Sequence, residues 1–243
     1  MGAAALFAAL SLLAKGFDAF GHARRAYREV GLNLFLWGLN AVLLRVLLFG
    51  LALSLTYPDH YFESFLFATL LSFLALEFAD YWLHRLRHSV ALWRFHRLHH
   101  SDPEMTWTTI HRKHPVDYML TVFGEYFFLL AAGVPAAGIV AASLFRSLYI
   151  AFVHADLNWS FGTLRYVLIT PWAHRYHHAL DERLAGANFG GVLSIWDRMF
   201  GTYVEPDHRA ETGVRDVPSP TKFLREMRWP TFAQLGPTKP PRS

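Results

Sequence analysis

The chain has 243 residues, of which 53% are hydrophobic and only 17% charged. Its mean hydropathy of +0.20 is high for a soluble globular protein. There is no cysteine, which excludes disulfides, iron–sulfur clusters and thiolate-bound haem or zinc. The net charge of +4 is modest, and its basic residues cluster in particular loops, which indicates membrane topology rather than a nucleic-acid partner.

Apolar runs dominate the first two thirds of the chain. Residues 1–29 contain a short apolar run at 3–14 without a charged start, which favours an interfacial helix or a short extra span over a signal peptide. Each of four further runs is predicted to cross a bilayer, which needs about 20 residues. These runs are 30–56, 62–83, 118–132 and 136–153, and turns at 57–60 and 133–135 join them into two hairpins.

The positive charges predict the orientation of these spans. The two short turns contain no Lys or Arg, and the opposite ends carry Arg24, Arg25, Arg28, Arg85, Arg87, Arg94, Arg97, Arg112 and Lys113. Positively charged loops stay in the cytosol. The predicted fold is therefore all-α: an integral membrane four-helix, two-hairpin bundle with a cytosolic, histidine-rich helical cap over residues 30–205. A cytosolic tail is expected over 206–243, and the membrane is of the inner (cytoplasmic) or endoplasmic reticulum type.

Three histidine clusters lie on the predicted cytosolic side. They read His84-x3-His88, His96-x2-His99-His100 and His174-x2-His177-His178. Spacings of three and four residues place side chains on one helix face. Eight imidazoles exceed the needs of one four-coordinate ion, so two metal ions are predicted. His154, at the end of the fourth apolar run, is a ninth candidate ligand.

Ligand chemistry leaves the metal open. Imidazole suits iron, zinc, copper and nickel alike. A site at the end of a membrane bundle faces lipid chains that carry no hydrolysable group along their length, so attack on them needs oxygen activation. This setting favours two iron ions with O2 as co-substrate. Zinc remains an alternative occupant of the isolated protein, since the affinity series places it above Fe2+.

The three clusters resemble the histidine boxes of the fatty acid hydroxylase / sterol desaturase superfamily. Flanking stretches at 154–158, 188–191 and 196–203 resemble the surroundings of its third box, and His114-Pro115-Val116-Asp117 resembles an element that follows the second. The resemblance implies a di-iron membrane enzyme that uses O2 and external electrons to hydroxylate or desaturate a lipid or sterol-like substrate. No fused electron carrier is recognisable, so a separate ferredoxin or a cytochrome b5-like protein with its reductase is expected as partner.

Several other residues have two interpretations. Asp80, Asn188 and Asp197 either orient a ligand ring or, for the acids, pair with a nearby Arg. We expect His111 and His114 either to support the ligand rings from behind or to be structural. Charges within the predicted spans usually face the bundle interior or a cavity, namely Arg45, Glu125 and Arg146. Arg45 either pairs with Glu125 or extends toward the membrane interface. Trp82, Trp93, Trp107, Trp159 and Trp172 are predicted belt residues at the membrane interface, and His22, His60 and His208 surface residues.

Two other functions remain as alternatives. A histidine-rich metal transporter would hold its ligands in mid-membrane on broken helices, whereas these ligands follow the ends of spans. A zinc-dependent membrane hydrolase would need a carboxylate base beside the metal, and the chain has no His-Glu-x-x-His element.

Overall fold

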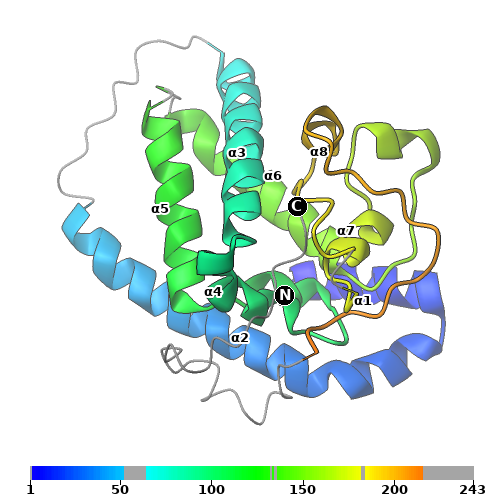
Figure 1. Ribbon diagram of the computed structural model, residues 1–243. Coiled ribbons are helices and arrows are strands. Elements are labelled where there is room, and N and C mark those ends of the chain that lie inside the picture. Colours follow the sequence, from blue (N-terminus) through cyan, green and yellow to red (C-terminus); the bar gives the residue numbers. More distant parts are fainter. Residues whose placement is uncertain (1, 52–63, 132, 134–135, 182–183, 216–243) are drawn as a thin grey trace.

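The computed structural model describes residues 2–51, 64–131, 133, 136–181 and 184–215, and this part is all-helical (Figure 1). Within it the only β pairings are two isolated bridges, Leu168–Leu193 and Ala179–Thr212. The helices are α1 (Gly2–Lys15), α2 (Asp18–Leu51), α3 (Phe65–Arg87), α4 (Val90–His100), the 3-10 helix η1 (Trp107–His111), α5 (Pro115–Ala131), α6 (Ala136–His154), the 3-10 helix η2 (Gly162–Tyr166), α7 (Pro171–His177) and α8 (Ile195–Met199).

Helices α3, α5 and α6 form the central layer. α3 makes its most extensive contacts with α6 and then with α5. Leu76, Leu129 and Ala142, one from each helix, pack together in the core between them. Because α5 runs antiparallel to the other two, the C-terminal ends of α3 and α6 meet the N-terminal end of α5, and the histidine clusters lie at this end.

The second predicted span continues as one helix through the first histidine pair. Ser64 caps the start of α3, where its Oγ accepts a hydrogen bond from Phe67 N at 3.3 Å. The helix runs to Arg87 and ends at His88, which caps it. α4 then begins at Val90. The chain therefore turns once between the first and second clusters, which brings their histidines to the same place.

α2 differs from the predicted first span. It begins at Asp18 rather than near residue 30, and Figure 1 shows it crossing below the ends of α3 and α5 instead of running beside α3. Its buried face mixes apolar residues, such as Ala26 and Leu36, with polar ones. Asn33 donates to Asp102 Oδ2 at 3.1 Å, and Asn40 donates to Lys113 O at 3.0 Å. Its exposed residues include Phe35, Trp37 and Val42, so part of the outward face of this helix is apolar.

Only α3, among the described residues, is long and apolar enough to cross a bilayer, and one such helix is weak evidence of a membrane protein. The apolar part of α6, Gly138–His154, is shorter. The predicted turn at 57–60, the adjoining ends of the first two runs, and residues 216–243 of the predicted tail lie outside the described residues. Residues 207–213 pack back on α7, where Arg175 Nε donates to Ala210 O at 2.8 Å.

Gly138 allows the closest approach of α6 to α3. A Cβ at this position would lie 2.4 Å from the backbone carbon and oxygen of Ala68. We therefore expect Gly138→Ala to force the helices apart and destabilise the protein by about 1–3 kcal/mol. Thermal unfolding in detergent measures this effect. Gly31→Ala is the matched control, because nothing lies within 4 Å of its new Cβ and alanine favours a helix. Equal unfolding midpoints for the two variants would contradict the close packing.

Candidate metal centre

The nine predicted ligands converge at one end of the central layer. α3 supplies His84 and its cap supplies His88, and α6 supplies His154. α4 carries the second cluster and α7, with its cap, the third. Pro171 opens α7, and Thr170 Oγ1 caps it by accepting from Ala173 N at 3.0 Å. All nine imidazoles are at most 6% exposed: His84, His88, His96, His99, His100, His154, His174, His177 and His178.

The rings form two adjacent groups. In each group, one nitrogen from every ring lies within 4.8 Å of the corresponding nitrogens of the others. The first group is His84, His88, His96, His100 and His177, and the second is His99, His154 and His178. His174 adjoins the second group, because its Nε2 lies 3.1 Å from His154 Nε2. His100 and His178 stack with centroids 4.4 Å apart, so the two groups are in direct contact.

Hydrogen bonds on the outer side fix the direction of four rings. The Nδ1–H of His84 donates to Phe189 O at 2.8 Å, and that of His177 donates to Ala187 O at 2.8 Å. His154 Nδ1–H donates to Ile150 O at 2.7 Å, and His96 Nδ1 lies 3.2 Å from Asp117 Oδ1. Because a carbonyl or carboxylate only accepts, the proton is on Nδ1 and the lone pair is on Nε2.

The inward-facing nitrogens are suited to cations. Nε2–Nε2 separations are 3.3 Å for His96–His100 and 3.2 Å for His99–His154. Two ligands of one ion at about 2.1 Å lie roughly 3.0–3.4 Å apart for bond angles near 90–110°. Buried nitrogens of His88 and His178, and Nε2 of His84 and His177, have no hydrogen-bond partner. Buried polar atoms are rarely left unpaired, so the residues present fit two imidazole-bound metal ions.

Four imidazoles of the second and third clusters, carried by α4 and by α7 with its cap, are held in the neutral form. Burial, followed by the neighbouring imidazoles, lowers the pKa of His99, His100 and His178 well below the ordinary value of 6.5. Burial lowers the pKa of His177 to about 3, although its bond to Ala187 opposes the shift. Only the neutral ring has a lone pair for a metal, so the site is ready to bind cations at neutral pH.

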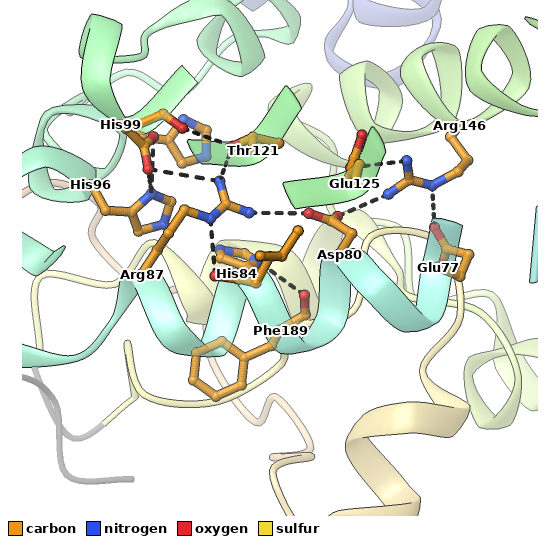
Figure 2. A network of polar contacts seen from close by, with 12 residues as sticks. Glu77, Asp80, His84, Arg87, His96, His99, Thr121, Glu125, Arg146 and Phe189 are labelled. Atoms are coloured by element: carbon orange, nitrogen blue, oxygen red, sulfur yellow. Dashed lines mark hydrogen bonds and ion pairs between the residues drawn. The ribbon is translucent and has the colours of Figure 1, made fainter. Parts of the chain in front are cut away.

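A chain of buried charges runs beside the histidines (Figure 2). Arg146 binds three carboxylates: Glu77 at 2.8 Å, Asp80 at 2.9 Å and Glu125 at 3.3 Å. Asp80 also accepts from Arg87 at 3.0 Å. Asp80 therefore takes the ion-pair role of its two interpretations and contacts no ligand ring directly. Glu125 and Arg146 face the interior, as predicted for charges in these runs, and the side chain of Arg45 lies outside the described residues.

Two carboxylates that contact no histidine hold the loop that orients His84 and His177. Asp197 accepts from Phe189 N and Gly190 N, each at 2.8 Å. Glu77 Oε2 accepts from Val192 N at 2.9 Å and from Leu193 N at 2.8 Å. Asn188 holds the same loop: its Nδ2 donates to Ala173 O and its Oδ1 accepts from Val204 N. Asp197 and Asn188 thus act on the rings through the backbone.

Asp117 is the residue that sequence reasoning undervalued. It was noted only as part of the His-Pro-hydrophobic-acidic element, yet its carboxylate lies directly behind His96. An acidic residue in the first turn of a helix that follows a histidine-rich segment was the available signal. His111 and His114 stay outside both histidine groups. His114 Nδ1 accepts from Val116 N at 3.1 Å, which is a structural contact.

Two predicted locations are wrong. Trp93 is not a belt residue: it is buried, with its ring 5.0 Å from that of His88 and 5.1 Å from that of His100. Its large side chain fills the space behind the first group. His22 is not a surface residue but is buried, with Nε2 3.0 Å from Glu104 O. His208 is exposed, as expected.

Asp117→Asn tests the contact behind His96. The amide keeps the size of the side chain but removes the charge that favours a firmly bound, basic imidazole. Such a change behind a ligand weakens metal binding by about 10–100-fold. Competition with a calibrated chelator measures this loss. Asp18→Asn is the control, because Asp18 is exposed and lies on α2, which carries none of the nine histidines. Unchanged metal affinity in Asp117→Asn would contradict the role of Asp117.

A cavity of about 370 Å³ opens beside the histidines. His84, His96, His99, His154 and His174 form one wall. The other walls come from α2, the segment after η1, α5 and α6. A ligand in this space therefore reaches the imidazoles of both groups, and it meets charged as well as apolar side chains.

The sequence that forms this site matches the model of a known protein family. The fatty acid hydroxylase model matches residues 69–202, which include all nine candidate ligands. That is more than half of the chain. The chain belongs to the fatty acid hydroxylase family. The resemblance inferred from the histidine boxes is therefore confirmed.

Curated relatives of this family member carry several activities in their names. An alkylglycerol monooxygenase of Xenopus tropicalis is 34% identical over 146 residues, 59% of this chain and 32% of the relative. Ornithine lipid hydroxylase OlsE of Rhizobium tropici is 30% identical over 191 residues, 75% of this chain and 56% of the relative. A Delta(7)-sterol 5(6)-desaturase of Gibberella zeae is 27% identical over 151 residues, 62% of this chain and 41% of the relative. The chain thus spans only about a third to a half of these relatives. No solved structure matches it.

Proposed function

We propose that this fatty acid hydroxylase family member is a membrane-bound, O2-dependent oxidoreductase that hydroxylates or desaturates a lipid or sterol-like substrate. The observation that carries the proposal is the pair of adjacent, buried imidazole groups with inward-facing, unpartnered nitrogens. The relatives' names, which include a monooxygenase, a lipid hydroxylase and a sterol desaturase, support the reaction class.

The nine histidines are proposed to hold two iron ions. His84, His88, His96, His100 and His177 would hold one ion, and His99, His154, His174 and His178 the other. Bound iron supplies the activation of O2 that attack on an unactivated C–H bond requires. An ion-loaded site with this many nitrogen ligands and no thiolate suits iron, and zinc competes for it in the isolated protein.

The chain's own residues are proposed to orient the imidazoles, bind the substrate and exclude water. The carbonyls at 187 and 189, with Asp117, keep three imidazoles turned toward the ions. The cavity beside them would receive the part of the substrate that reacts. Phe189 and Trp93 pack against the ring of His88 and restrict access of water to the first imidazole group. The lipid tail is proposed to enter sideways between helices.

The proposed location is an integral membrane with the histidines on the cytosolic side. Exposed apolar side chains at the opposite end of the central layer support this, including Leu66 in α3, Phe127 in α5 and Val140 in α6. We propose that a multi-pass membrane anchor includes α3, α5, α6 and the apolar run 30–56. The basic loops near the histidines agree with a cytosolic orientation. Electrons are proposed to come from a separate ferredoxin or a cytochrome b5-like protein with its reductase.

The described acidic residues disfavour a hydrolase. Asp117 binds His96, and Asp80 and Glu77 bind arginines, so these carboxylates are not available as a general base beside a metal-bound water. The ligands also lie at the ends of continuous helices rather than in broken ones, which disfavours a transporter.

Lipid profiling with 18O2 tests the proposed function. Cells expressing the chain, and cells expressing a His88→Ala variant, are supplied with 18O2, and their lipids are compared by mass spectrometry. We expect a lipid with one labelled oxygen added, or one with two hydrogens lost, only with the unaltered chain. Identical lipids together with altered metal uptake would instead indicate a transporter.

A further inference from the structure

Three cationic side chains line the cavity beside the histidines: Arg87, Arg146 and Lys113. Arg87 is bound to Asp80 and donates to Thr121 Oγ1 at 3.1 Å. Arg146 is bound to three carboxylates. Both guanidinium groups are therefore occupied by the protein itself and have little capacity left for a ligand.

Lys113 differs from both arginines. Within the described ranges its ammonium makes no hydrogen bond, and no carboxylate lies within the 4.0 Å that defines an ion pair. The side chain is half-buried, and burial lowers its pKa. An ammonium that is partly removed from water and has no partner is stabilised by binding an anion.

The backbone of Lys113 is fixed. Asn40 Nδ2 donates to Lys113 O at 3.0 Å, and Lys113 N donates to His111 O at 2.9 Å. Asn40 and Tyr118 line the same cavity, and the hydroxyl of Tyr118 has no hydrogen-bond partner in the described part of the chain. A positive charge and a free hydroxyl are thus held on one wall by a rigid backbone, while histidines form another.

We propose that Lys113 anchors an anionic group, a carboxylate or a phosphate, at the polar end of the lipid substrate. This inference deepens the proposed function and rests on it. Since the anchor and the imidazoles of both groups line one cavity, the oxidised carbon lies near the polar end of the lipid and not at the far end of its chain. Neutral lipids of the same chain length are poorer ligands.

Glu125 provides a matched contrast. It lines the same cavity, its side chain is 21% exposed, and it has one ion-pair partner, Arg146 at 3.3 Å. A head group recognised through its positive charge would depend on Glu125 instead of Lys113. The two residues therefore distinguish an anionic from a cationic ligand in one experiment.

Nitroxide-labelled lipids test the proposal on the purified, metal-loaded protein in neutral detergent. The probes are 5-doxylstearic acid, phosphatidic acid with a 5-doxylstearoyl chain, and the neutral 5-doxylstearic acid methyl ester. The nitroxide quenches the fluorescence of Trp37, which lines the cavity, and a Trp37→Phe variant identifies that part of the signal. Probe partitioning into micelles is measured separately and subtracted.

We expect at least one anionic probe to bind about tenfold more tightly than the ester. Lys113→Met should remove this preference and keep ester binding, whereas Lys113→Arg and Glu125→Gln should keep the preference. A preference for the phosphate or for the carboxylate probe alone identifies the anion. Equal binding of all probes to the unaltered protein, a preference that survives Lys113→Met, or its loss in Lys113→Arg or Glu125→Gln would overturn the proposal.

Failure of the anion site and failure of the proposed oxygenase are distinguishable. Iron content and 18O incorporation are measured on the same preparations. A protein that prefers the anionic probe but forms no oxygen-derived product keeps the Lys113 site and loses the oxygenase assignment. A protein that forms the oxygen-derived product but shows no preference for the anionic probe keeps the oxygenase assignment and loses the Lys113 site.

Discussion

His88→Ala is expected to lower the iron content from about two ions per chain, the number proposed for the unaltered protein, to about one. Both nitrogens of His88 are buried and unpartnered, and the ring lies within the first imidazole group. Loss of a residue that only orients a ligand already weakens metal binding or activity by about 10–100-fold, so loss of the ligand itself should reduce product formation by more than about 100-fold. Mass spectrometry of metal content and 18O incorporation measure the two effects.

A companion variant assigns the second ion. His99→Ala removes a member of the second group, and it should also leave about one ion. His208→Ala is the control, since its side chain is 62% exposed. Thermal unfolding establishes that each variant is folded. Two ions retained in both His88→Ala and His99→Ala would mean that the imidazoles serve packing and not coordination.

Arg146→Met is expected to produce the largest loss of stability outside the metal site. The guanidinium is buried, and its removal leaves Glu77, Asp80 and Glu125 without their shared partner. Breaking a buried ion pair by removing one member costs about 3–5 kcal/mol. For a protein of this size, that lowers the unfolding midpoint by roughly 10 °C. The measurement is thermal unfolding of the detergent-solubilised protein.

Two further variants separate charge from size. Arg146→Lys keeps the charge but cannot reach three carboxylates at once, so its unfolding midpoint should fall between those of the unaltered protein and Arg146→Met. Arg25→Met removes an arginine whose side chain is 64% exposed and whose contact with Glu104 measures 3.6 Å, so it should have little effect. If Arg146→Met unfolds at the same temperature as Arg25→Met, the buried network does not stabilise the fold.

The nine proposed ligands could be predicted from the sequence, but their surroundings could not. Spacing within each cluster predicted that several imidazoles share a face, and all nine do lie together. Which histidines form each group depends on the turn between α3 and α4 and on the position of α7, and neither follows from local spacing. The carbonyls of Ala187 and Phe189 leave no sequence signal, because any residue supplies a carbonyl.

The helices were predicted better where burial and hydropathy agree. α3, α5 and α6 match the second to fourth apolar runs within a few residues. α2 was predicted less well, because Asn33 and Asn40 are few among the apolar residues of the run 30–56 and do not lower its average hydropathy. Their spacing places them on one helix face, and that face is buried against the segment after α4.

The dependence of His84 on Phe189, and of His177 on Ala187, has a consequence for biogenesis. The ribosome makes the first cluster early. The ring of His84 is oriented only after residues 187–193 have been made and have docked on Glu77. We therefore expect metal insertion to follow the synthesis of residues 187–193. Nascent chains arrested before residue 187 should hold the metal far more weakly than released ones.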